Sequence, residues 1–510
     1  MINASSISAK TFNKTQLLSG IEQKNCAQSL GSVVRGNPRN ALERDVEFPF
    51  VDASKDSKKL YMARARAKRS YTEKEQLEYR HEKRAVLYKG LAIASKVLPN
   101  YVNKKGETRQ HSVCLCRRYM QTHENAKSHV VLSVDKNHIA KLNDLIVCDN
   151  SWLCPVCSSV NLDRKAKEIT QVQKNFLEAG QGKRWSTWMM TLTIPHSRTD
   201  KLDDLLTKKS AVMSDLHAHS VIKKLKARIG WQGYVDSLEI KHGQSNGWHP
   251  HHHILAFCTN LHENTRVQCV HDAKRNYYRI ATQHDKKTNR KIEKIEVQKY
   301  IYHVFAYLCV KHGLSRPSED HGVDFKKSDD IQDYLTKQSK IALELTGEHS
   351  KTSGESRTQW EILRDCASEN KQLASHSKAL FLEFAEATKG KAKLHWSPYF
   401  KEQYLDEKEE EEIGVGDDEE EIVNEYIISA ELWHRFFTGI NRSHQKLLLK
   451  LAENDSFYGT EKAKNHLMRL SKIIADEKEK VRRDFKERER IRFEVWLANT
   501  PPPICERMMH

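Results

Sequence analysis

Residues 247–257, which read GWHPHHHILAF, constrain the fold of this chain more than any other stretch. Four of these residues are histidines: His249, His251, His252 and His253. The turn-like residues GQSNG at 243–247 precede them and the apolar residues ILAF follow, a pattern typical of a buried strand that leaves a hairpin. Alternate side chains on a strand share a face, so His251 and His253 point one way and His252 points the other way.

The hairpin supplies a third candidate ligand. If the turn is centred on Ser245, the preceding strand at 233–240 places Glu239 opposite His251 and on the same face. A shift of one residue in the register would remove this alignment. Two imidazoles and a carboxylate form a donor set for a divalent cation, so we predict a metal site at Glu239, His251 and His253. The alternative is a solvated histidine patch that binds metal adventitiously.

These residues resemble a known family. The segments YVDSLEIKHG and NGWHPHHHILAF, at 234–243 and 246–257, resemble the replication initiator (Rep) proteins of small rolling-circle plasmids, in the single-tyrosine branch of the HUH endonuclease superfamily. His252 occupies a position where that family usually has an apolar residue. The resemblance implies a catalytic Mg²⁺ or Mn²⁺ ion at the histidines, and two imidazoles with one carboxylate suit Mn²⁺ somewhat better.

The order of the predicted elements indicates an α+β fold. Residues 188–195 (WMMTLTIP) are typical of a strand and resemble the first Rep motif, residues 202–229 are typical of one helix, and the two hairpin strands follow. This order fits an antiparallel sheet with helices. The resemblance implies that the sheet is palm-like (RRM-like). We expect a small zinc-binding module before the sheet and a helical C-terminal extension after it.

A tyrosine about eighty residues after the histidines provides the second chemical group, in SDDIQDYLTKQSK. Ser328 is a good N-cap, with acids in the first turn and lysines later, so residues 329–340 are predicted to be helical. On that helix Asp330, Tyr334 and Lys337 lie at i, i+4 and i+7 and form one stripe. An ordinary charged surface helix would also explain this pattern.

The string Tyr-Leu-Thr-Lys resembles the Tyr-x-x-Lys nucleophile motif of the Rep family. The resemblance implies that Tyr334 is the nucleophile and that Lys337 holds the phosphate. The single-tyrosine branch usually has Glu four positions before the tyrosine, to activate water, and Asp330 occupies that position here. Because Asp is shorter than Glu, Asp329 is the alternative base.

Two further tyrosines, Tyr300 and Tyr302, are alternative candidates for the nucleophile. They lie on residues 297–311, which are predicted to be helical, and their spacing is equally typical of aromatic packing. The chain has no Gly-x-x-x-x-Gly-Lys-[Ser/Thr] motif, so strand separation requires supercoiling or a partner helicase.

A cysteine-rich segment precedes the histidines. Its members are Cys114, Cys116, Cys148, Cys154 and Cys157. A Cys-x-x-Cys turn followed by a helix, here 162–179, lets two thiolates share one tetrahedral Zn²⁺. The predicted structural zinc ligands are Cys116, Cys148, Cys154 and Cys157. Cys114 is the alternative fourth ligand, and a redox pair or unpaired core thiols are the alternative interpretations.

The charge of the chain favours a polyanionic partner. Lys and Arg number 85 against 68 Asp and Glu, a net charge of +17. The densest basic stretch is KKLYMARARAKR, at 58–69, and a helix is predicted at 72–97. The candidate DNA contacts are Lys58, Lys59, Arg64, Arg66, Lys68 and Arg69. A solvated helix face explains the same basic pattern equally well.

The length of 510 residues allows two or three domains. The predicted regions are a basic, partly disordered N-terminal extension at 1–110, a cysteine-rich zinc-binding module at 111–180, an HUH endonuclease core at 181–365, a connecting segment with an acidic linker at 366–425, and a helical C-terminal region at 426–510. No apolar run approaches the roughly 20 residues of a membrane span, and the N-terminus has no signal-peptide core. We therefore expect a cytoplasmic protein.

The resemblance implies a rolling-circle initiator that binds a plasmid origin and nicks one strand. The reaction would be a metal-dependent transesterification on single-stranded DNA that forms a 5′-phosphotyrosine and a free 3′-OH for host DNA polymerase. A host helicase is a further expected partner. The alternatives are an HUH-type relaxase or transposase, and a non-catalytic DNA-binding regulator.

Overall fold

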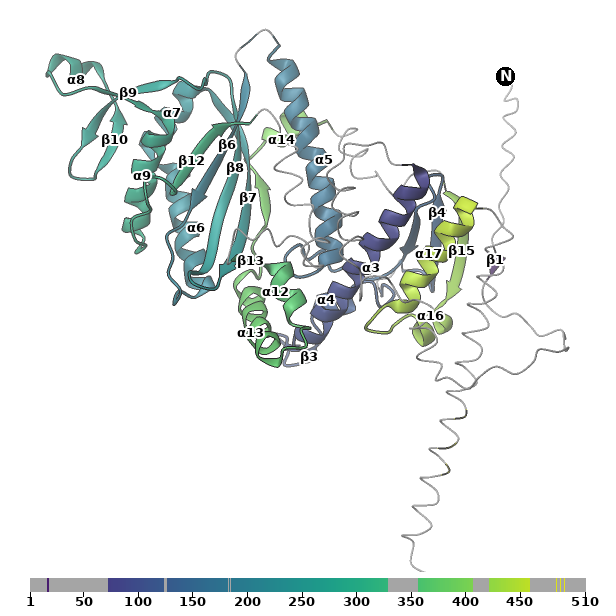
Figure 1. Cartoon of the computed structure of the whole chain (residues 1–510). Coiled ribbons are helices and arrows are strands. Elements are labelled where there is room, and N and C mark those ends of the chain that lie inside the picture. The colour runs from purple at the N-terminus through teal and green to yellow at the C-terminus, as the bar shows by residue number, and fades with distance from the viewer. Residues whose placement is uncertain are drawn as a thin grey trace, which may run out of the picture.

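The computed structural model describes residues 16–17, 72–122, 126–181, 183, 185–328, 356–406, 422–458 and the isolated positions 483, 487 and 490. This part of the chain forms helices and sheets whose strand pairs are antiparallel except for β1 (Gln16–Leu17) with β15 (Ile422–Ser429), so the protein is α+β as predicted (Figure 1). The palm-like classification of the sheet stays a prediction. None of the described helices is both long and apolar enough to cross a membrane.

The central sheet carries the histidine hairpin. Its strands, in spatial order, are β12 (Val323–Lys327), β6 (Ser186–Thr193), β8 (Gly247–Cys258), β7 (Trp231–Gly243) and β13 (Ser356–Thr358), and β14 (Leu394–Trp396) also pairs with β7. All these pairings are antiparallel. The predicted strand at 188–195 is therefore confirmed as β6, shifted by two residues.

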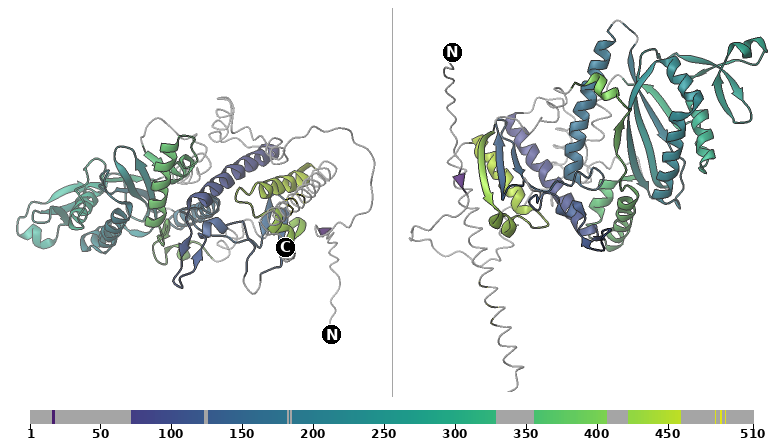
Figure 2. Two further views of the ribbon diagram at one scale, coloured as in Figure 1. Left: turned by 90° about the horizontal axis from the view of Figure 1, so that it is seen from below. Right: turned by 180° about the vertical axis from the view of Figure 1, so that it is seen from behind.

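Helices cover both faces of this sheet. On one face lie α6 (Leu202–Ala218), α7 (Ser220–Ile229) and α9 (Val297–Lys311), and on the other lie α5 (Pro155–Ala179) and the short α14 (Phe400–Tyr404) (Figures 1 and 2). Successive β8 residues enter different hydrophobic clusters: Ile254 packs with the α6 side and Leu255 with Phe176 of α5. This double burial explains why the second half of β8 is continuously apolar.

The single helix predicted at 202–229 is wrong, because the structure breaks it at His219. That residue is extended (φ −62°, ψ 126°), and its ring Nδ1 accepts a hydrogen bond from Val221 N–H at 3.3 Å. The side chain thus caps a new helix, α7, which ends at Gly230 in the left-handed region (φ 67°). The apolar spacing is helical on both sides of the break, so periodicity alone does not detect it.

A second sheet joins distant parts of the chain. Its strands are β4 (His129–Asp135), β5 (Ala140–Asn143), β15 (Ile422–Ser429) and β1 (Gln16–Leu17). The helices α16 (Ala430–Phe436) and α17 (Ser443–Tyr458) pack on it, and α3 (Glu73–Val97) packs against α17. Residues 422–429 are therefore a strand, and the prediction that they contain the end of a disordered linker and the start of a helix is wrong. The helix predicted at 72–97 is confirmed as α3.

The remaining elements lie around these two sheets. They are β2 (Tyr101–Val102), β3 (Thr108–Arg109), α4 (Ser112–Leu115), α12 (Gln359–Asp365) and α13 (Lys371–Ala387). A separate three-stranded sheet, β10 (Tyr277–Ile280), β9 (Arg266–Asp272) and β11 (Glu293–Glu296), carries the short helix α8 (Gln283–Lys287). This last unit, whose elements were not predicted, projects from the end of the molecule (Figures 1 and 2).

Candidate metal sites

The β7–β8 hairpin has the predicted register. Glu239 pairs with His251 and Gly243 with Gly247, so the turn is centred on Ser245. Gly247 has φ 75°, and a Cβ atom there would lie 2.9 Å from Arg198 Cα. Only glycine fits this position without strain, and it closes the turn that places Glu239 and His251 opposite each other.

Three side chains converge on the face of the sheet that carries α5. Glu239 Oε2 accepts hydrogen bonds from Nε2 of His251 at 2.7 Å and from Nε2 of His253 at 2.9 Å. The three residues are partly exposed, and their ligand atoms could hold a metal ion. Ligands about 2.1 Å from an octahedral cation and at right angles to each other are about 3.0 Å apart, close to these separations. The residues present therefore fit a divalent cation.

The electrostatics of this site favour the protonation states in which its side chains can bind a metal. Burial opposes charge on Glu239, but hydrogen bonds from His251 and His253 lower the pKa of the Glu239 carboxyl. Burial lowers the pKa of His251 despite its contact with that carboxylate. An ionised carboxylate beside a neutral imidazole is the combination that binds a metal.

Two neighbouring residues were missed by the sequence analysis. Thr191 on β6 lies opposite His253, with its hydroxyl 3.2 Å from His253 Nδ1, and Lys241 Nζ lies 3.0 Å from Glu239 Oε1. Thr191 comes from a strand that pairs with β8 only in the folded sheet, so no local pattern identifies it. Lys241 stands two residues after Glu239 and so shares its face, a signal that the strand period does contain.

His252 lies on the opposite face, as its position on the strand predicts. Its Nδ1 donates a hydrogen bond to Asp236 Oδ1 at 2.5 Å, and both side chains are buried. Lys209 of α6 is also buried near this pair, and burial lowers the pKa of Lys209 to about 8. His252 therefore has a hydrogen-bond partner on β7.

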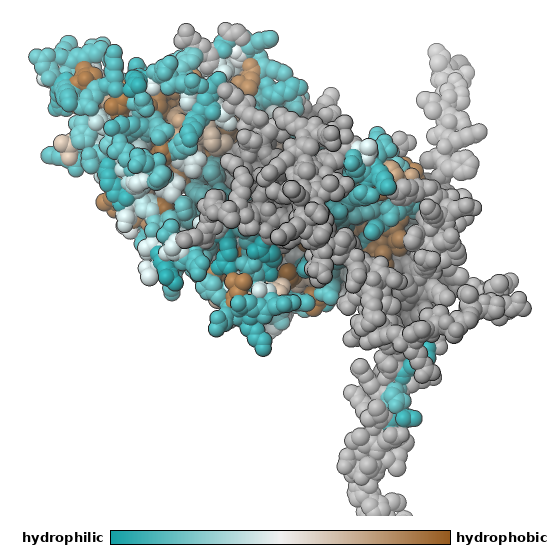
Figure 3. Space-filling model, in the orientation of Figure 1, coloured by the Kyte–Doolittle hydropathy of each residue, from teal (hydrophilic) through white to brown (hydrophobic). Residues whose placement is uncertain are grey.

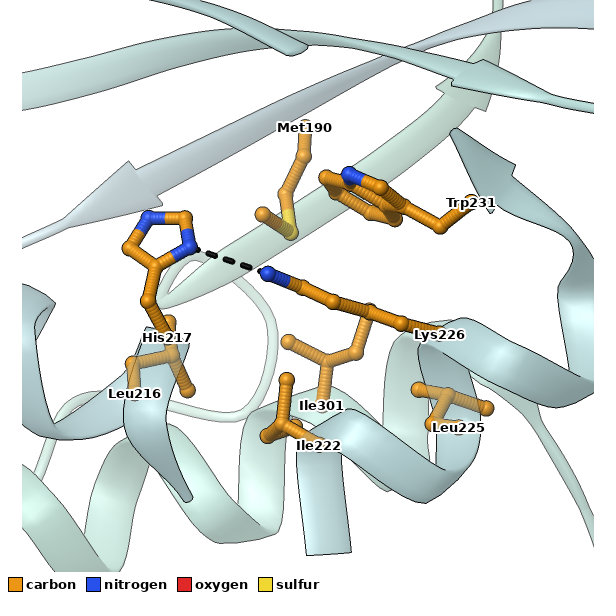
Figure 4. Close-up of a pocket in the computed structure, with 8 residues that line it drawn as sticks. All are labelled: Met190, Leu216, His217, Ile222, Leu225, Lys226, Trp231 and Ile301. Carbon is orange, nitrogen blue, oxygen red and sulfur yellow. Dashed lines mark hydrogen bonds between the residues drawn. The ribbon is translucent and has the colours of Figure 1, made fainter. Parts of the chain in front are cut away.

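A small cavity of about 20 Å³ lies farther along this opposite face (Figure 4). His217 and Lys226 point toward each other there, with His217 Nδ1 accepting a hydrogen bond from Lys226 Nζ at 3.0 Å. Burial lowers the pKa of His217 to about 4 and that of Lys226 to about 8. The cavity is large enough for about one water molecule, so it is a packing defect and not a ligand site.

The predicted nucleophile and its helix lie outside the described residues. This applies to Tyr334, Asp330, Lys337 and the alternative base Asp329, and also to the predicted DNA contacts Lys58, Lys59, Arg64, Arg66, Lys68 and Arg69. The strands on either side of residues 329–355 are β12 and β13, which lie at opposite edges of the central sheet.

The rival tyrosines are poorly placed for catalysis. Tyr300 and Tyr302 are both buried on α9, where their hydroxyls donate to the carbonyl of Val221 at 3.4 Å and to that of Pro317 at 2.9 Å. Burial also raises the pKa of Tyr300. Both residues therefore have the packing role that was their alternative interpretation.

The four predicted zinc ligands form a second cluster. Cys116 Sγ lies 3.5 Å from Cys157 Sγ and 3.8 Å from Cys154 Sγ, and Cys148 Sγ lies 3.6 Å from Cys157 Sγ. Four sulfurs about 2.3 Å from a tetrahedral Zn²⁺ are about 3.8 Å apart, so the cluster could bind a metal such as zinc. Cys114 is not part of this group, and its thiol points to the carbonyl of Ser95 at 3.6 Å.

Local structure and a distant arginine support the cluster. Cys154 is the N-cap of α5, which begins at Pro155 and so starts earlier than the predicted 162. Hydrogen bonds from the neighbouring thiols lower the pKa of Cys116. Arg442, only 1% exposed, donates to the Cys116 carbonyl at 2.9 and 3.1 Å. Its positive charge offsets the negative charge that thiolates would bring to this buried position.

Fold and sites together define an α+β protein with two side-chain clusters that could hold metal ions. Residues 139–434, more than half of the chain, match the family described as "Replication protein", and the chain belongs to this family. The match includes the histidine hairpin and three of the four clustered cysteines, whereas Cys116 and Arg442 lie outside it.

Two known proteins are similar to parts of this chain. The chain is 25% identical over 305 residues to "Protein rep" of Streptomyces lividans, which covers 51% of this chain and 63% of that protein. It is 29% identical over 146 residues to a "Neomycin resistance protein" of Streptomyces cyanogenus, which covers 24% of this chain and 32% of that protein. The chain therefore spans less than two thirds of either relative. No solved structure matches it.

Proposed function

We propose that this protein initiates rolling-circle replication of a plasmid by binding the origin and nicking one strand. The observation that carries the proposal is the convergence of Glu239, His251 and His253 on one face of the central sheet. Membership of the replication protein family and the name of the Streptomyces lividans relative support it. The substrate is DNA that is single-stranded at the nick site, and the protein acts in the cytoplasm.

The proposed nucleophile is the Tyr334 hydroxyl. Its oxygen forms a bond to the scissile phosphorus while the bond from phosphorus to the 3′-oxygen breaks. The tyrosine proton leaves to solvent or a nearby base, the departing oxygen takes up a proton, and the products are a 5′-phosphotyrosine and a free 3′-OH. Lys337 holds the phosphate by a charge-assisted hydrogen bond. Host DNA polymerase then extends the 3′-OH, and a host helicase separates the strands.

The hairpin residues would hold a catalytic Mg²⁺ or Mn²⁺. When bound, such an ion supplies Lewis-acid polarisation of the phosphate. Thr191 holds the His253 ring through Nδ1 and so directs Nε2 toward the site. Lys241 places a positive charge beside Glu239, where it can also attract the DNA backbone.

Termination is proposed to use an acid on the tyrosine helix. Asp330, or Asp329 in its place, activates a water that hydrolyses the phosphotyrosine after one round. Alternatively, a free 3′-OH attacks the phosphotyrosine phosphorus and rejoins the strand, with the Tyr334 oxygen as the leaving group. Neither route needs a second tyrosine. The cysteine cluster has a structural part in this scheme, since four protein ligands leave no position on a Zn²⁺ for substrate.

Covalent capture of DNA tests the proposal. Purified protein is incubated with Mn²⁺ and a labelled oligonucleotide that carries the plasmid origin hairpin, and adducts are resolved on a denaturing gel. We expect a detergent-stable adduct with the natural sequence and with Tyr300→Phe, and none with Tyr334→Phe. Capture by Tyr334→Phe would reassign the nucleophile. Binding without any adduct would favour a DNA-binding regulator, and the genes beside the coding sequence distinguish an initiator from a relaxase or transposase.

A further inference from the structure

Residues 266–296 form an arm that the proposed nicking chemistry does not use. The arm consists of β9, β10, α8 and β11, and it is inserted between the histidine strand β8 and helix α9. It makes its own sheet and projects beyond the end of the central sheet (Figures 1 and 2). The projecting end is mainly hydrophilic on the face that Figure 3 displays.

Hydrogen bonds and aromatic packing stabilise the arm although it projects from the molecule. The carboxylate of Asp285, only 1% exposed, accepts hydrogen bonds from Arg279 at 2.7 and 2.5 Å and forms a capping box with Thr282. At the base of the arm, the ring of Tyr277 packs against Tyr307 of α9 with centroids 5.2 Å apart. The basic side chains of α8 are therefore presented in a defined position.

The charge of the arm is strongly positive and partly uncompensated. Nine of its residues are Lys or Arg and four are Asp or Glu. Five of the nine basic residues have acidic partners within the arm: Arg266, Arg275, Arg279, Arg290 and Lys291. The other four are exposed and have no ion pair among the described residues: Lys274, Lys286, Lys287 and Lys294.

The arm offers charge but no fully exposed Tyr, Phe or Trp ring on which bases can stack. Within residues 266–296, all of which the structure describes, no large hydrophobic side chain is fully exposed: Tyr277 is only 6% exposed, and the partly exposed Tyr278 packs its ring against His271 and His303. Proteins that hold single strands combine positive charge with exposed aromatic rings, whereas contacts to a duplex backbone require only the charge. The composition of this surface therefore favours double-stranded over single-stranded DNA.

We propose that the arm binds the phosphate backbone of duplex DNA through Lys274, Lys286, Lys287 and Lys294. The lysines lie at the turn between β9 and β10, on the helix α8 and on the strand β11. Ribbons of β-strands are one of the elements with which proteins contact a DNA groove. The arm thus holds the duplex, while the separate histidine face acts on the single strand. This inference goes beyond the nicking reaction and does not depend on it.

The test replaces the four arm lysines together by glutamine and measures DNA binding by fluorescence anisotropy. The probes are a labelled duplex and a labelled single strand of the same sequence, each titrated at several salt concentrations. At about 0.1 M salt we expect duplex affinity to fall at least tenfold, and the magnitude of the slope of log K against log salt to fall by about 3.6, since each of the four phosphate contacts contributes about 0.9. Single-strand affinity should change less than threefold.

The matched control replaces four exposed lysines outside the arm, Lys104, Lys105, Lys136 and Lys371, by glutamine. This variant loses the same charge and should retain duplex affinity within threefold. The proposal is overturned if the arm variant binds duplex as the natural sequence does, if the control loses as much affinity, or if both probes weaken equally. Capture of a preformed single-stranded oligonucleotide is measured in parallel, so a failure of the nicking chemistry is recognised separately from a failure of the arm.

Discussion

At the scale of single residues, hydrogen bonds to the histidines of β8 fix the orientation of their rings. Thr191 contacts the ring nitrogen of His253 that faces away from Glu239, and Asp236 contacts the ring of His252 on the other face. Neither contact involves a ligand atom. Both restrict the rotation of a histidine on β8, so they pre-organise the strand that carries the site.

Substitution of Thr191 tests this positioning. Thr191→Val keeps the shape of the side chain and removes the hydroxyl, so we expect Mn²⁺ affinity to fall by about 10- to 100-fold. Calorimetric titration of Mn²⁺ into the purified protein measures the change. The control is Thr193→Val, two residues along the same strand, which leaves the His253 contact intact. Equal affinities of Thr191→Val and the natural sequence would show that the hydroxyl has no orienting role.

The buried pair of His252 and Asp236 should be strongly coupled. His252→Leu introduces an apolar residue at this position but removes the closest hydrogen-bond donor of the buried Asp236 carboxylate, at a cost of about 3 kcal/mol. The double variant His252→Leu with Asp236→Leu removes both polar groups and should be more stable than His252→Leu alone. Urea unfolding of the two single variants and the double variant measures the coupling. Additive effects would mean that the two side chains act independently.

At the scale of elements, a buried carboxylate joins helices from the two ends of the described chain. Glu453 of α17 is fully buried and accepts hydrogen bonds from Arg84 of α3 at 2.8 Å and from the Ala140 backbone at 3.1 Å, while His81 Nε2 lies 2.8 Å from it. A carboxylate in this position is stabilising only while its partners are in place. The contact between α3, α17 and β5 should therefore depend on pH.

The sign of this dependence follows from the pKa of Glu453. Burial acts to raise it, but the hydrogen bonds from His81 and Arg84 lower the pKa to about 2, from an ordinary value of 4.5. A lowered carboxyl pKa contributes stability that is complete above about pH 4.5 and is lost as the pH falls toward 2. The contribution is about 3 kcal/mol.

Glu453→Gln should therefore lower the free energy of unfolding at pH 7 and flatten its dependence between pH 5 and pH 3. Urea unfolding at these pH values measures both effects. The control is Glu431→Gln, which replaces an exposed glutamate on α16. An unchanged pH dependence in Glu453→Gln would assign acid sensitivity to other carboxyls.

At the scale of the whole molecule, the cysteine cluster connects three segments. Cys116 follows α4, the other three cysteines lie around the start of α5, and Arg442 reaches the carbonyl of Cys116 from the segment between α16 and α17. A metal bound here would hold these segments together. Its loss should therefore destabilise parts of the chain that are far apart in sequence.

Metal content provides the direct measurement. We expect one zinc per chain in the purified protein by elemental analysis, a lower melting temperature after chelation, and no retained zinc in Cys154→Ser. Cys114→Ala is the matched control, since Cys114 is a neighbouring buried cysteine outside the cluster. A zinc-free natural protein would contradict the assignment, and loss of zinc in Cys114→Ala would return Cys114 to the ligand set.

Contacts between distant segments account for most of what the sequence analysis missed. The helix of 72–97 and the strand of 188–195 were predicted because their apolar periods are local. The pairing of β15 with β4 was not, because an acid-rich stretch precedes β15 and its partner lies in the other half of the chain. The break between α6 and α7 at His219 was not predicted, because a single capping hydrogen bond does not change the spacing of the apolar residues.

The sequence by itself determined the histidine hairpin, its register and the shared face of Glu239, His251 and His253. A two-residue period and a tight turn are local properties, and together they specify a strand pair. Only the tertiary structure decided that Thr191 supports His253, that Asp236 is the partner of His252, and that Arg442 and Glu453 contact segments more than 300 residues earlier in the sequence. Those contacts depend on which strands and helices become neighbours, and that is settled by packing over the whole molecule.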